Sequence, residues 1–150
     1  MKAPLLVPID LLGDGSGPVS QALLPALAEL NRSERPLVLL AERPDRWRPT
    51  RNQVDQALSR QSSIEETVHR AGGAVDAVLY LDVGLFSRER HRREALQGLA
   101  ERYDLQAADL RIVAAPGRLG DLLRRTDLDV VGAADMSELV DRIRTLAREE

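Results

Sequence analysis

The chain has 150 residues, of which 24 are acidic and 21 basic, and its formal net charge is -3 at pH 7. Hydrophobic residues make up 43% and charged residues 30%, which excludes a disordered chain and allows one domain over residues 1–150 with its own core. The sequence has no Cys, which excludes disulfides, thiolate metal sites and Cys nucleophiles. No apolar run is long enough for a membrane span and no signal peptide is recognised, so we expect a cytoplasmic protein.

The basic residues are all Arg except Lys2. Arginine richness is typical of proteins that recognise phosphate or nucleic acid. Here the acidic residues outnumber the basic ones, and the Arg residues are spread along the chain. The composition therefore disfavours nucleic-acid binding.

Short apolar runs alternate with longer amphipathic segments in chain order. The apolar runs predict five strands, at residues 4–9, 36–41, 74–81, 110–115 and 128–131. The amphipathic segments predict helices at 19–30, from Thr50 to residue 70, at 87–102, at 117–125, and from a cap at Asp135 or Ser137 to the end. A capping box at 50–53 and a Gly pair at 72–73 bound the long helix.

Five strands, each followed by a helix, predict a parallel sheet covered on both faces, that is, a three-layer α/β/α sandwich. Ligands of such sheets bind beyond the carboxyl ends of the strands. The segments that follow these ends are 10–17, 41–45, 81–93 and 114–121. We expect any functional site to lie among them.

The first predicted strand ends in Asp10-Leu11-Leu12-Gly13. This segment resembles the Asp-x-Asp-Gly motif of the haloacid dehalogenase (HAD) phosphatase superfamily. Residues 24–40 and 50–80 are similar to the first two helices and the second and third strands of its histidinol-phosphate and heptose-bisphosphate phosphatase branch, including an Ala-Gly-Gly turn. The resemblance covers nearly the whole chain and implies a Rossmann-like, HAD-like sheet without a large cap domain.

In that family an Asp attacks the phosphoryl group, a second Asp moves the proton, a hydroxyl and a Lys hold the phosphate, and further Asp residues hold Mg²⁺. The resemblance places Asp10 at the nucleophile and Leu12 at the proton-transferring position, where Leu can do no acid–base chemistry. It places Ala41 at the hydroxyl position and Ala115 at the metal carboxylate. Arg92 falls near the Lys position and keeps its positive charge.

These losses favour a catalytically degenerate, HAD-like pseudoenzyme that acts by binding, without a cofactor. The expected partner is another protein or a second copy of the chain. The residues expected to contact it lie after the second and third strands: Trp47, Arg46, Arg88 and Arg90. Structural roles are the alternative, with Trp47 packed as a plug of its loop and residues 88–93 forming a solvated helix start paired with Glu89 and Glu94.

Two other functions stay open. In the first, the chain is a Mg²⁺-dependent phosphatase that uses Asp10 as its nucleophile. In the second, the remnant pocket senses phosphate or a nucleotide through anion-binding residues at Arg92, Gly13 and Arg43. Asp10 also has a structural alternative, in which it caps the Gly-rich turn that follows it.

Overall fold

The computed structural model describes residues 2–12, 23–43, 51–81, 89–114, 123, 129–132 and 136–149. Its strands are β1 (Leu5–Pro8), β2 (Leu37–Glu42), β3 (Ala77–Leu81), β4 (Arg111–Ala114) and β5 (Asp129–Gly132). Its helices are α1 (Leu23–Arg32), α2 (Arg51–Arg70), α3 (Glu89–Glu101) and α5 (Met136–Arg148), with 3₁₀ turns η1 (Ile9–Leu12) and η2 (Ala107–Asp109). Of the predicted helix at 117–125, the structure describes Leu123 alone, and Leu123 is helical.

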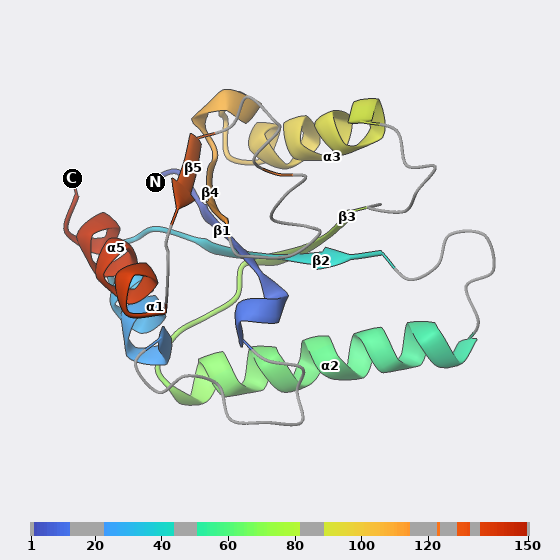
Figure 1. Ribbon diagram of the computed structural model, residues 1–150, viewed down its shortest axis with the longest axis horizontal. Helices are drawn as coiled ribbons and strands as arrows, with labels where there is room; N and C mark the ends of the chain where they lie inside the picture. The colour runs from blue at the N-terminus through green and yellow to red at the C-terminus, as the bar shows by residue number, and fades with distance from the viewer. Residues whose placement is uncertain are drawn as a thin grey trace.

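The strands form one parallel sheet in the order β3-β2-β1-β4-β5. Helices α1, α2 and α5 cover one face, and α3 covers the other (Figure 1). The predicted three-layer α/β/α sandwich with a five-stranded parallel sheet is therefore confirmed. None of the described helices is both long and apolar enough to cross a membrane.

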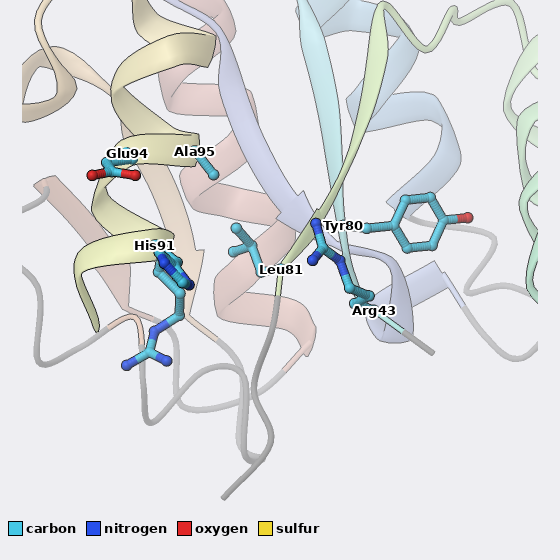
Figure 2. A pocket seen from close by; sticks show the side chains of 7 residues that line it. Arg43, Tyr80, Leu81, His91, Glu94 and Ala95 are labelled. Atoms are coloured by element: carbon cyan, nitrogen blue, oxygen red, sulfur yellow. The ribbon is translucent and has the colours of Figure 1, made fainter. Parts of the chain in front are cut away.

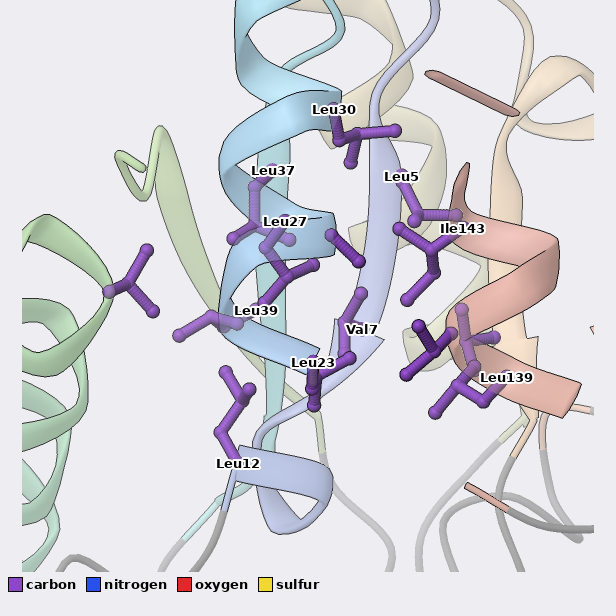
Figure 3. Close-up of a cluster of buried hydrophobic side chains, with 14 of the residues drawn as sticks. Leu5, Val7, Leu12, Leu23, Leu27, Leu30, Leu37, Leu39, Leu139 and Ile143 are labelled. Atoms are coloured by element: carbon purple, nitrogen blue, oxygen red, sulfur yellow. The ribbon is translucent and has the colours of Figure 1, made fainter. Parts of the chain in front are cut away.

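The apolar runs of β1 and β2 supply core side chains to both faces of the sheet. Leu5 and Val7 pack in the cluster formed with α1, α2 and α5 (Figure 3), whereas Leu6 packs in the cluster with α3. All three side chains are fully buried. Strands covered on both faces need apolar residues at successive positions, which explains why these runs do not alternate with polar residues.

A tight turn joins α2 to β3, as the Gly pair predicted. Gly72 has a φ of +92°, a conformation that costs other residues energy, and the Gly73 N–H donates to the carbonyl of Val68. A Cβ at position 73 would lie 3.0 Å from Val68 Cγ1 and 3.1 Å from Asn31 Oδ1. The same Asn31 oxygen accepts a hydrogen bond from the Ala74 N–H at 2.9 Å, which ties this turn to α1.

At two predicted boundaries the structure shows why the prediction was wrong. The third strand begins at Ala77 and not at Ala74. The Ala74 N–H donates to the side chain of Asn31 and not to a strand. The chain first bonds to the sheet at Asp76, whose N–H donates to the carbonyl of Leu37. The last helix begins at Met136, so Ser137 lies inside its first turn and is not its cap. The other predicted caps, Asp135 and Thr50, lie outside the described residues.

Candidate functional site

The carboxyl edge of the sheet carries the predicted site residues that the structure describes. Asp10 lies in η1, directly after β1, and Arg43 directly follows β2. Arg90 and Arg92 lie in the first turn of α3. The other predicted site residues, Gly13, Arg46, Trp47 and Arg88, lie outside the described part of the chain.

Asp10 forms an ion pair with α2. Its Oδ1 accepts a hydrogen bond from Arg60 Nη2 at 2.7 Å, with the Asp10 side chain 61% exposed and the Arg60 side chain 31% exposed. Such a charge-assisted bond is stronger than one between neutral groups. Arg60 was not among the predicted site residues, although it lies one helical turn before the buried Ile64 and so on the inward face of α2.

The side chain of Leu12 belongs to the hydrophobic core. Leu12 is fully buried in the same cluster as Leu23 of α1, and Figure 3 shows both among the side chains of this cluster. Ala41, near the end of β2, is also buried in this cluster. The two positions that the resemblance assigns to a proton donor and a phosphate-binding hydroxyl are thus filled by apolar packing groups.

A cavity of about 600 Å³ lies between the end of β3 and the start of α3 (Figure 2). Its size falls within the range of small-molecule sites, about 300–1,000 Å³. The lining residues are Arg43, Tyr80, Leu81, His91, Arg92, Glu94 and Ala95. Arg43 and Arg92, two of the predicted anion-binding residues, thus line one cavity together with His91, and anion binding there stays a prediction.

The remaining charges at the start of α3 pair within the helix. Arg90 Nε lies 3.0 Å from Glu94 Oε1, and Arg93 Nη2 lies 2.8 Å from Glu89 Oε1. The side chain of Arg90 is 85% exposed, and exposed pairs of this kind contribute at most about 1 kcal/mol. Local pairing with Glu89 and Glu94 is thus confirmed for Arg90 and Arg93, and a partner contact through Arg90 stays a prediction.

Tyr80 connects this cavity to α2. Its hydroxyl donates a hydrogen bond to Gln61 Oε1 at 2.6 Å, and Figure 2 shows its ring directed away from His91. Burial, with the nearby negative charge of Glu65, raises the pKa of Tyr80 above its ordinary value. The neutral hydroxyl thus holds α2 against β3, next to the Asp10–Arg60 pair.

A phosphatase of this family requires Mg²⁺, and the described residues offer that ion few ligands. Among them, no three His, Asp or Glu side chains lie close enough together to hold a metal. The Asp10 carboxylate already has a guanidinium partner, and Mg²⁺ prefers several oxygen ligands in octahedral geometry. The described residues therefore do not fit a magnesium site. Ala115, which the resemblance places at the metal carboxylate, lies outside them.

Comparisons with known proteins place the fold. No protein-family model matches the sequence, and no curated protein does. Among solved structures, the D,D-heptose 1,7-bisphosphate phosphatase of B. bronchiseptica, complexed with magnesium and phosphate, is similar at a TM-score of 0.63 and 16% identity, covering 97% of this chain and 99% of its own. The corresponding phosphatase of Burkholderia thailandensis is similar at a TM-score of 0.59 and 14% identity, covering 94% and 97%.

A third solved structure is similar over nearly the whole chain. A protein from Mesorhizobium loti, described as a HAD-like phosphatase, is similar at a TM-score of 0.60 and 18% identity, covering 99% of this chain and 89% of its own. At such identities structural similarity speaks for the fold and not for the activity. The chain has the fold of the HAD-like phosphatases.

Proposed function

We propose that this chain is a HAD-fold protein that binds an anionic ligand at the carboxyl edge of its sheet and does not hydrolyse it. The observation that carries the proposal is the position of Leu12, which is fully buried in the core where the resemblance calls for a proton-transferring Asp. Hydrolysis of a phosphate ester needs a proton for the leaving oxygen and a cation against the developing negative charge. The described residues supply no proton donor at this position, and they do not fit a magnesium site.

Binding is supported by the cavity beside α3. Arg43 and Arg92 line it, and their planar guanidinium groups match phosphate and carboxylate oxygens. His91 adds a third nitrogen donor, while Glu94, the acidic residue among the described lining residues, is engaged by Arg90. The lining is therefore suited to a small anion, such as a phosphate group.

A protein partner or a second copy of the chain is the proposed carrier of this anion. Residues 44–50, which include Arg46 and Trp47, follow Arg43 in sequence, and Arg88 directly precedes α3. Trp and Arg are the residues that contribute most at protein interfaces. An acidic or phosphorylated group on the partner would then enter the cavity, while Arg90 would contact the partner's surface.

The second candidate is a HAD-type phosphatase that uses Asp10. It is favoured by the comparisons, since two of the similar structures are heptose bisphosphate phosphatases and one of them was complexed with magnesium and phosphate. The place of Asp10 directly after β1, with its side chain 61% exposed, also favours it. The comparisons support this candidate better than the first, and the core position of Leu12 supports the first.

The release of inorganic phosphate from p-nitrophenyl phosphate separates the two candidates. The full-length chain is assayed with Mg²⁺ beside Asp10→Asn, with Asp55→Asn on the exposed side of α2 as the matched control. We expect no release above buffer for any of the three proteins. Mg²⁺-dependent release that Asp10→Asn abolishes and Asp55→Asn retains would establish the phosphatase.

A further inference from the structure

We infer that the guanidinium of Arg60 is the built-in counter-charge of Asp10 and keeps divalent cations away from the end of β1. The two groups are 2.7 Å apart, within hydrogen-bond distance. The inference concerns Asp10 alone, and it does not depend on which anion binds in the cavity beside α3.

The helix directs Arg60 toward the sheet. Ile64 and Val68, four and eight residues further on, are buried in the core, so Arg60 lies on the same face of α2 one turn earlier. Its side chain is 31% exposed, compared with 75% for Arg70 at the other end of the helix. Arg60 therefore occupies a half-buried position at the rim of the core.

A second contact holds this turn of the helix in place. Gln61, the next residue, accepts the hydroxyl hydrogen bond of Tyr80 from β3 at 2.6 Å. Consecutive residues of α2 are thus bonded to η1 and to β3, two elements at the same edge of the sheet. Because both bonds fix the turn, the guanidinium is already positioned at the carboxylate without a ligand.

A cation that approached Asp10 would have to displace this guanidinium or be repelled by it. A divalent ion and an arginine side chain carry charges of the same sign, and a single carboxylate is a weak ligand for either Mg²⁺ or Mn²⁺. A positive charge of the chain itself therefore lies beside the carboxylate at which the resemblance implies a metal ion. The pair also satisfies the Asp10 carboxylate, so that no metal is required for the local fold.

Paramagnetic broadening by Mn²⁺ tests the inference. Amide signals of Leu11 and Leu12 are followed in ¹H–¹⁵N spectra of the full chain while MnCl₂ is added to wild type, Arg60→Gln, Arg60→Lys and the double variant Arg60→Gln/Asp10→Asn. Arg70→Gln, which removes an exposed pair with Glu66 on the same helix, is the matched control. Circular dichroism checks that each variant is folded.

We expect these two signals to keep their intensity in wild type, Arg60→Lys and Arg70→Gln. They should lose intensity in Arg60→Gln and recover it in the double variant, which lacks the carboxylate. Equal broadening in wild type and Arg60→Gln, or none in a folded Arg60→Gln, would overturn the inference. The wild-type spectrum decides by itself if Arg60→Gln does not fold, since broadening there overturns exclusion and its absence supports it. Neither result changes the phosphate release that we expect from p-nitrophenyl phosphate, so the two proposals can fail separately.

Discussion

Two neighbouring regions of the carboxyl edge differ in charge. At the end of β1 the Asp10 carboxylate is neutralised by Arg60, and the next inward side chain, Leu12, belongs to the core. At the ends of β2 and β3, Arg43 and Arg92 line a cavity of about 600 Å³. Under the proposed function, the positive charge that binds the anion lies at the second region, whereas the carboxylate that would attack it in a phosphatase lies at the first.

The largest expected effect comes from restoring the family motif at the first region. Leu12→Asp places a carboxylate at a fully buried core position, where it has no cationic partner among the described core residues. We expect the free energy of unfolding to fall by about 3–5 kcal/mol, as measured by urea denaturation. Leu11→Asp, at a partly buried position, should cost clearly less. A stable Leu12→Asp protein that hydrolyses phosphate esters would contradict the assignment of Leu12 to the hydrophobic core.

The second region should respond to phosphate. Inorganic phosphate at tenfold its Kd would stabilise the folded chain by about 1.4 kcal/mol, which raises the Tm by several degrees, about 2–4 °C per kcal/mol. Arg92→Gln should lose most of this rise in a thermal melt. Arg93→Gln, which removes an exposed pair with Glu89 and is not among the described lining residues, is the control and should keep it. An equal loss in both variants would mean that phosphate binds elsewhere.

Tyr80 links the two regions, because it lines the cavity and its hydroxyl bonds to Gln61, the residue after Arg60. Tyr80→Phe removes its hydrogen bond to Gln61 and should lower the free energy of unfolding by about 1 kcal/mol. The phosphate-induced rise in Tm should not change, because the hydroxyl bonds to α2 and the ring is directed away from His91 (Figure 2). A lost phosphate response would show instead that the hydroxyl takes part in binding.

The raised pKa of Tyr80 adds a pH dependence with a defined sign. The unfolded state loses this proton near the ordinary tyrosine value, before the folded state does, so stability should fall as the pH rises above about 10. Burial and the hydrogen bond to Asp76 raise the pKa of Tyr103 to about 12, which adds to the fall in every variant. Urea denaturation at pH 9 and 11 should show a smaller fall for Tyr80→Phe than for wild type.

The smallest effect is the coupling between Asp10 and Arg60. Because both side chains are partly exposed, a double-mutant cycle of Asp10→Asn and Arg60→Gln should give a coupling of about 0.5–1 kcal/mol in urea denaturation. The coupling should shrink in 1 M NaCl, since salt screens exposed pairs. A coupling of zero at low salt would show that Arg60 does not stabilise the Asp10 carboxylate, which contradicts the description of the first region.

The sheet could be predicted from the sequence because strands covered on both faces need continuous apolar runs, and runs such as 36–41 have the length of a strand. The sequence also predicted the turn at Gly72, since a positive φ favours Gly. It missed the start of β3, which a side chain of α1, Asn31, displaces to Ala77. Local pattern carries no information about such a long-range contact.

The site was predicted unevenly for the same reason. Arg43 and Arg92 could be placed together because each follows a strand, and parallel strands end at one edge of the sheet. Arg60 is 50 residues from Asp10 and lies in the middle of a helix rich in charged residues. Its position one turn before Ile64 is the single local signal that it faces inward.

Phosphorus NMR of a phosphate monoester in the presence of the full chain and Mg²⁺ tests the central claim most directly, because it reports binding and hydrolysis in one sample. We predict that the ester signal broadens in wild type, sharpens again in Arg92→Gln, and is not replaced by inorganic phosphate. An inorganic phosphate signal that grows in wild type and not in Asp10→Asn would contradict the account.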